Sequence, residues 1–159
     1  MADAAVSFHT GATVNLACFE DKGQVYALDV VAVREIVRTQ PLTPLPNSPA
    51  LIEGVMDLRG AVIPVLDLAR VLDLGARSEA LSARIVVLEF EDLVFGLWVD
   101  AATDVLTLES SRLEDVPTLA TPAGYDSVRS VVRREGESPV MVLALEGLLE
   151  KVYRTDLPQ

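Results

Sequence analysis

The sequence predicts an all-β fold of two small antiparallel barrels, each of about five strands, packed side by side with a few short helices. Half of the 159 residues are hydrophobic but only 5% are aromatic. The core must therefore be built from Val, Leu, Ile and Ala, and the β-branched members of this set favour strands. From residue 14 onward, short apolar runs alternate with turn signals, and the second half repeats the order of the first.

Two hairpins are expected in the first half, because pairs of apolar runs flank glycine-containing turns: residues 14–20 with 24–28, and residues 55–58 with 61–66. Between them, residues 30–37 have apolar side chains at helical spacing, which favours one or two helical turns over a strand. Four prolines between residues 41 and 49 then predict an extended connection. Asp67 is expected to cap a helix over residues 68–74, which Gly75 ends.

The two halves match each other in two blocks. Residues 26, 28, 30, 35 and 36 match residues 95, 97, 99, 104 and 105 at an offset of 69, and residues 65–72 match 142–149 at an offset of 77. Chance similarity between segments rich in Val and Leu is the alternative to a duplication. Because both blocks occur in the same order, a duplication is favoured.

The repeat predicts the domain organisation. Residues 1–12 are expected to be a tail, residues 13–152 one domain with barrel subdomains at about 14–75 and 84–149, and residues 153–159 a second tail. A barrel of about 65 residues is marginal on its own, so the two should pack together. The strand at residues 93–99 is apolar on both faces: Phe95, Leu97 and Val99 should lie on one, and Val94 and Trp98 on the other.

Charge and composition exclude several kinds of partner. The formal net charge is −11, which opposes binding to nucleic acid or to an anionic membrane surface. The N-terminus lacks a signal-peptide pattern, and the longest uncharged stretch contains four prolines, so no membrane insertion is expected. A single cysteine, Cys18, is expected to be a buried apolar residue. These features predict a cytoplasmic protein.

Residue patterns for catalysis are missing from the sequence. The one histidine, His9, has no cysteine or carboxylate at metal-ligand spacing. Gly54 and Gly60 do not belong to a phosphate-binding motif, and no Ser, Cys or Lys lies in a nucleophile motif. Acidic pairs such as Glu91-Asp92 fall in expected turns. The sequence therefore predicts no catalytic residues, no metal and no cofactor.

Residues 46–68, PNSPALIEGVMDLRGAVIPVLDL, strongly resemble the CheW family, whose typical string is P-N-x-P-x-x-I-x-G-V-x-N-L-R-G-x-V-I-P-V-x-D-L. Residues 26–30 and 33–37 resemble the family's early strand and its V-x-E-I motif. Residues 95–100 and 104–106 resemble its second-half motif. The match covers about residues 14–149. The chain departs from the family pattern at three positions: Asp57 replaces Asn, Ser130 replaces a second-half Gly, and Ala27 replaces a common Gly.

The resemblance implies two five-stranded barrels of the SH3-like or OB-like kind and a scaffolding function. The expected partners are the cytoplasmic tip of a chemoreceptor coiled coil and the regulatory domain of a CheA-type histidine kinase, within receptor arrays at the inner membrane. The output is chemotaxis or motility. A paralogue with a gliding, twitching or developmental role, and a small-ligand-binding barrel without protein partners, are the alternatives.

The resemblance also implies two sets of contact residues. The receptor-binding set is a hydrophobic groove with one charge: Val30, Val33, Glu35, Ile36, Val99, Ala101 and Val105. The kinase or array set is the expected turn: Asp57, Leu58, Arg59 and Gly60. The simpler alternatives are core packing for the valines, and solvated surface charges for Glu35 and Arg59.

Overall fold

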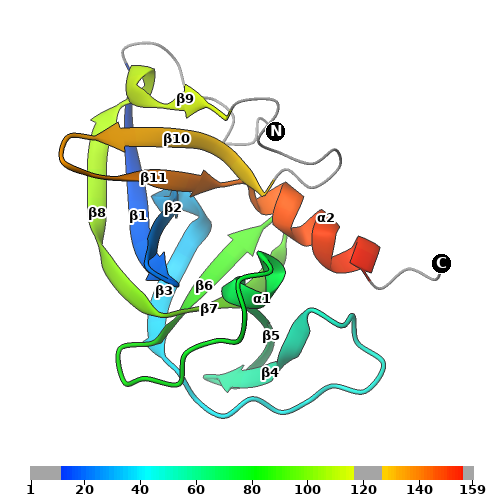
Figure 1. Cartoon of the computed structure of the whole chain (residues 1–159). Helices are drawn as coiled ribbons and strands as arrows, with labels where there is room; N and C mark the ends of the chain where they lie inside the picture. Colours follow the sequence, from blue (N-terminus) through cyan, green and yellow to red (C-terminus); the bar gives the residue numbers. More distant parts are fainter. Residues whose placement is uncertain (1–11, 117–126, 156–159) are drawn as a thin grey trace.

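The computed structural model describes residues 12–116 and 127–155, which form two β-sheets and two α-helices (Figure 1). Five consecutive strands of the chain form one sheet, and the strands before and after them form the other. In Figure 1 the sheet that contains β1, β2, β8, β10 and β11 lies above the sheet that contains β4 to β7. The fold class predicted from the sequence is confirmed.

The first sheet has six strands in the order β8-β1-β2-β11-β10-β9. A short 3₁₀ helix, η2 (Ser110–Arg112), connects β8 and β9, which are the strands at the two opposite edges of this sheet, so the edges are brought near each other as in a barrel. The strands are β1 (Thr13–Asp21), β2 (Gln24–Asp29), β8 (Ala101–Glu109), β9 (Glu114–Asp115), β10 (Val128–Arg134) and β11 (Glu137–Leu143).

The second sheet has five strands in the order β3-β6-β7-β5-β4. Thr43, in the proline-rich segment after β3, exchanges two backbone hydrogen bonds with Val55 of β4, at 2.9 and 2.8 Å. This bridge joins the two edges of the sheet, which therefore closes as a barrel. The strands are β3 (Val33–Arg38), β4 (Ile52–Leu58), β5 (Ala61–Asp67), β6 (Arg84–Phe90) and β7 (Leu93–Val99).

Short helices lie in the connections between strands. The 3₁₀ helix η1 (Val30–Ala32) precedes β3, and α1 (Leu68–Val71) follows β5. Asp67 caps α1 as predicted, because its Oδ1 accepts the backbone N–H of Ala69 at 3.1 Å. The last element, α2 (Leu145–Thr155), contacts α1 beside the junction of the two sheets (Figure 1).

The buried apolar residues form three clusters. One lies within the six-stranded sheet, one within the five-stranded sheet, and the largest joins the two sheets to α1 and α2. Strand β7 contributes to two of them: Phe95, Leu97 and Val99 belong to the joining cluster, whereas Trp98 belongs to the five-stranded barrel. The predicted two-sided burial of this strand is confirmed, and it fits two barrels that share one core.

The strand pairing differs from the predicted division of the chain at residues 75 and 84. Neither half closes its own barrel, because β1 and β2 pair with second-half strands, while β6 and β7 pair with first-half strands. The first half contributes β1 and β2 to the six-stranded barrel, and the second half contributes β6 and β7 to the five-stranded barrel. The exchange explains how 65-residue units avoid marginal stability: each barrel can form only when both halves are folded.

Three predicted boundaries are also wrong. Residues 33–38 form strand β3 rather than helical turns, because alternate side chains point inward and outward along it. Helix α1 ends at Val71 instead of residue 74, since Asp73 has a positive φ of 60°. Helix α2 extends to Thr155, so the predicted tail from residue 153 begins too early. The predicted tail at 1–12 lies outside the described residues except for Ala12.

Candidate protein-binding surface

The turn between β4 and β5 presents the predicted kinase-contact residues. Leu58 pairs with Ala61, so Arg59 and Gly60 alone form the loop, with φ values of 51° and 89°. Two positive φ values are those of a type I′ turn, which matches the twist of a hairpin. The Oδ1 of Asp57 accepts the backbone N–H of Gly60 at 2.8 Å. An Asn oxygen would accept the same bond, so Asp57 preserves the turn while adding a charge.

Arg59 and Glu35 form an ion pair at the rim of the five-stranded barrel. The Nη2 of Arg59 donates to Oε2 of Glu35, which lies on β3. The hydrogen bond to Glu35 and the charge of Glu35 raise the pKa of the Arg59 guanidinium above its ordinary value. The Arg59 side chain is 69% exposed and that of Glu35 is 32% exposed. Both side chains therefore remain available to a partner, and the bond to Glu35 holds the planar guanidinium of Arg59 in one orientation.

A shallow cleft of about 240 Å³ opens beside this ion pair. Its floor includes Ile63 and Val87, which are buried in the five-stranded barrel, whereas Val62 at its side is 70% exposed. We name this region the Glu35–Arg59 surface and define it by the residues that line the cleft: Arg34, Glu35, Leu58, Arg59, Ala61, Val62, Ile63, Val87 and Val94. It combines a fixed charge pair with uncovered apolar area.

The members of the predicted receptor set differ in burial and lie on different elements. Val30 and Val33 are partly buried, and Val33 packs against the joining cluster. Ile36 and Val105 are exposed. Ala101, at the start of β8, is partly buried and pairs with Glu20. These residues come from η1 and β3 on one side and from β8 on the other.

One predicted contact residue is wrong, and one bond links the two predicted sets. Val99 is 0% exposed and belongs to the joining cluster, so its side chain cannot line an accessible groove, and that prediction is wrong. Glu35 and Arg59 were assigned to different partners, but they are bonded to each other. A ligand that reaches one of them is within reach of the other.

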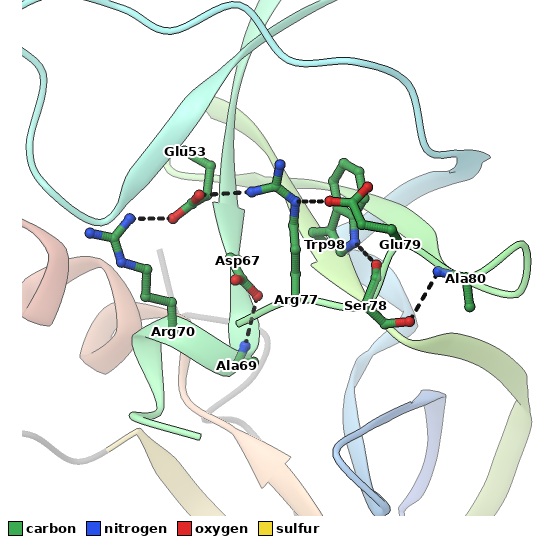
Figure 2. A network of polar contacts seen from close by, with 9 residues as sticks. All are labelled: Glu53, Asp67, Ala69, Arg70, Arg77, Ser78, Glu79, Ala80 and Trp98. Carbon is green, nitrogen blue, oxygen red and sulfur yellow. Dashed lines mark hydrogen bonds and ion pairs between the residues drawn. The ribbon is translucent and has the colours of Figure 1, made fainter. Parts of the chain in front are cut away.

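A polar network that the sequence did not indicate fixes the connection between the two halves (Figure 2). Glu53 of β4 accepts from Arg70 at 2.5 Å and from Arg77 at 2.7 Å. The Arg77 guanidinium lies 4.6 Å from the ring centroid of Trp98, and the indole Nε1 donates to the carbonyl of Ser78 at 2.9 Å. These contacts hold residues 77–80 against β4 and β7, so the network is structural.

Two features are absent from the part of the chain that the structure describes. Within residues 12–116 and 127–155, no three His, Cys, Asp or Glu side chains are grouped so that they could hold a metal ion. None of the helices in this part of the chain is long and apolar enough to cross a membrane.

Comparison with known proteins identifies the family. The CheW-like domain family matches residues 15–152. A chemotaxis protein CheW of Rhizobium meliloti (strain 1021) is 34% identical over 127 residues, which cover 80% of this chain and 82% of the relative. A chemotaxis protein CheW of Bacillus subtilis (strain 168) is 33% identical over 117 residues, 74% of this chain and 75% of the relative.

Structural comparison agrees with the sequence comparison. The crystal structure of the scaffolding protein TtCheW from Thermoanaerobacter tengcongensis superposes with a TM-score of 0.77 at 28% identity, covering 86% of this chain and 92% of that one. The match includes both barrels, since it extends over most of each chain. The chain therefore belongs to the CheW family of chemotaxis scaffold proteins.

Proposed function

We propose that this chain is a non-catalytic cytoplasmic adaptor that joins the tip of a chemoreceptor coiled coil to the regulatory domain of a CheA-type histidine kinase. In this proposal the kinase contact is the β4–β5 turn with Asp57, Leu58, Arg59 and Gly60, within arrays at the inner membrane. The receptor contact is formed by Val30, Val33, Glu35, Ile36, Ala101 and Val105. Family membership supports the adaptor role, and the Glu35–Arg59 surface supports the kinase contact.

The observation that carries the kinase contact is the pairing of a directed arginine with exposed apolar area. A guanidinium cannot be neutralised near neutral pH and presents several donors in a plane, so it suits a fixed contact with a partner's acceptors. Val62, 70% exposed, offers apolar area next to it. Protein interfaces are built from such an apolar centre with an arginine anchor.

The same cleft argues against the small-ligand alternative. Sites for small molecules have volumes of roughly 300–1,000 Å³ and enclose most of the ligand. The cleft here measures about 240 Å³ and is shallow, and its charged residues lie at its exposed rim. A flat partner that covers the rim fits this shape better than a molecule that enters it.

Charge reversal in the ion pair tests the proposal. We expect Arg59→Glu to weaken binding to the kinase regulatory domain at least tenfold, because it loses a charge-assisted contact and presents the wrong sign. The double variant Glu35→Arg/Arg59→Glu rebuilds the ion pair in reverse. If the pair contacts the kinase, the double variant should bind as weakly as the single one.

The measurement is the affinity of purified variants for the kinase regulatory domain, with a receptor fragment in a parallel experiment. Arg133→Glu is the matched control, because Arg133 also forms an exposed ion pair, with Glu114, in the other barrel. Full recovery of binding in the double variant would show that the pair only supports the fold. Wild-type binding by Arg59→Glu alone would refute the kinase contact.

A further inference from the structure

Two carboxyl groups meet where the chain crosses from one barrel to the other. Asp21 ends β1 of the six-stranded sheet, and Asp100 connects β7 of the five-stranded sheet to β8. Asp21 is only 1% exposed. The backbone N–H of Asp100 donates to Asp21 Oδ1 at 3.1 Å, and that of Lys22 donates to Asp100 Oδ2 at 2.9 Å. Each carboxyl group thus uses one oxygen to hold the other's segment.

The remaining oxygen of each group is buried without a partner. Asp21 Oδ2 and Asp100 Oδ1 are both inaccessible and accept no hydrogen bond. A buried acceptor without a donor is costly, and two adjacent buried charges of the same sign add repulsion. One proton placed between these two oxygens removes both costs, because a protonated carboxyl group donates to an ionised one.

We propose that Asp21 and Asp100 form a proton-binding site that holds one acid proton between Asp21 Oδ2 and Asp100 Oδ1 and thereby fastens the crossing between the barrels. No other donor is required, since each partner supplies what the other lacks. This proposal is independent of the kinase contact, because it concerns the joint between the barrels rather than the Glu35–Arg59 surface.

The groups that face the site favour the bound proton. From β5, the buried Asp67 adds negative charge. From β2, Tyr26 also faces the site, and burial first, then the charge of Asp21, raise the pKa of its hydroxyl. The Lys22 side chain is exposed in the turn, and the Ser82 hydroxyl donates to the carbonyl of Asp100 at 3.1 Å. Burial first, and then the charge of Asp100, raise the pKa of Asp21 from 3.8 to about 7.

The direction of the pH effect follows from this shift. In the unfolded chain Asp21 loses its proton near its ordinary pKa of 3.8, whereas in the folded chain it keeps the proton up to a pKa of about 7. The proton therefore favours the folded state fully below the lower value. Its stabilising contribution decreases as pH rises, and it is lost once pH passes about 7.

Asp21→Asn tests the site in the full chain. An Asn at this position keeps Oδ1 as acceptor for Asp100 and offers its amide N–H to Asp100 Oδ1, so it imitates the protonated acid permanently. When the pH is raised from about 5 to about 9, we expect the urea concentration at the unfolding midpoint to decrease for the wild type. For Asp21→Asn the decrease should be much smaller. Asp104→Asn, an exposed change on β8 that removes the same charge, should retain the wild-type decrease.

Carboxyl-carbon NMR of the aspartate-labelled protein identifies the titrating group. We expect one aspartate resonance to titrate near neutral pH in the wild type and in Asp104→Asn, and to disappear in Asp21→Asn. If Asp21→Asn does not fold, Asp100→Asn serves instead, because its amide can donate to Asp21 Oδ2 while its oxygen accepts from Lys22.

Three results would overturn the proposal. The first is the absence of any aspartate that titrates above about pH 5.5. The second is a near-neutral titration that persists in both Asn variants. The third is recovery of stability on addition of magnesium or calcium ions at about pH 9, which would assign the two oxygens to a cation instead of a proton.

Discussion

The hairpins β4–β5 and β10–β11 occupy equivalent places in the two barrels, yet only the first carries an arginine in its turn. Both have a register shift near the start, between Ile52 and Gly54 in the first and between Val128 and Ser130 in the second. Both are covered by a closing segment, through the pairs Thr43–Val55 and Glu114–Val131. Both then place a strand parallel to one from the other half, β5 to β7 and β11 to β2.

The equivalence ends at the tips of the hairpins. By its place as the first residue of the turn, Arg59 in the first hairpin corresponds to Glu135 in the second. By the offset of 69 residues, Glu35 corresponds to Asp104. The first pair is a bonded arginine and glutamate, whereas the second pair consists of two acids. In the second hairpin Arg134 bonds instead to Ser138 and Glu137 of its own hairpin. The same fold therefore carries the proposed binding surface in one copy and a turn bonded within its own hairpin in the other.

The largest expected effect on stability is a substitution at the register shift in β4, compared with a substitution at the equivalent shift in β10. A Cβ added at Gly54 would lie 2.7 Å from the backbone oxygen of Thr43, in the segment that closes the five-stranded barrel. Because backbone cannot move aside as a side chain can, Gly54→Ala should lower the free energy of unfolding by about 1–3 kcal/mol. Ser130, the equivalent residue, already has a Cβ, so Ser130→Ala should cost about 1 kcal/mol or less. Urea unfolding of both variants measures the two losses of stability. Equal losses would contradict the idea that the backbone of Thr43 approaches β4 too closely for a side chain at residue 54.

A smaller effect is expected where the two halves exchange strands. Gly96 of β7 and Ala27 of β2 are equivalent, and each pairs in parallel with the other half. A Cβ at Gly96 would lie 2.6 Å from Cγ2 of Ile85, a side-chain atom that can move aside more easily than the backbone oxygen next to Gly54. Gly96→Ala should therefore cost about 1 kcal/mol, at the low end for overpacking. Combining it with Ile85→Leu, which removes Cγ2, should reduce this cost in thermal unfolding. If the destabilising effects of the two substitutions simply add in the double variant, the contact between the new Cβ and Ile85 is not the cause of the loss.

The smallest effect is expected at Asp57. Asp57→Asn keeps the oxygen that accepts the Gly60 N–H, so the free energy of unfolding should change by less than about 0.5 kcal/mol. Asp57→Ala removes the acceptor and should cost about 1 kcal/mol. The two variants can be compared by thermal unfolding. Equal effects would mean that the hydrogen bond contributes nothing to the turn.

The sequence predicted the positions of the strands better than the way in which the strands pair. Alternating apolar runs and glycine turns located the hairpins, because a strand and its tight turn depend on adjacent residues. Strand exchange between the halves was missed, since two equivalent sets of strands can pair within or between halves with the same local pattern. Residues 33–38 were misassigned because Val30 belongs to the preceding 3₁₀ helix and Ile36 lies on the exposed face of the strand, so the apolar residues have a spacing that resembles a helix.

The candidate site was predicted in part for similar reasons. The turn residues Asp57 to Gly60 form one contiguous motif, and they lie together as expected. The bond between Glu35 and Arg59 joins residues 24 positions apart, and no local pattern could indicate it. Val99 was misplaced because a strand that is apolar on both faces does not show which face is covered. The Glu53–Arg77–Trp98 network was missed because its members are distant in sequence.

In the proposed function, binding to the kinase depends on the β4–β5 hairpin and not on the β10–β11 hairpin. Kinase activation in a complex reconstituted from receptor fragment, kinase and purified adaptor measures this most directly, with Arg59→Ala compared with Arg133→Ala. We expect Arg59→Ala to reduce activation at least tenfold at limiting adaptor concentration, while both melting temperatures stay within about 3 °C of wild type. Wild-type activation by Arg59→Ala, or an equal loss in Arg133→Ala, would contradict the claim.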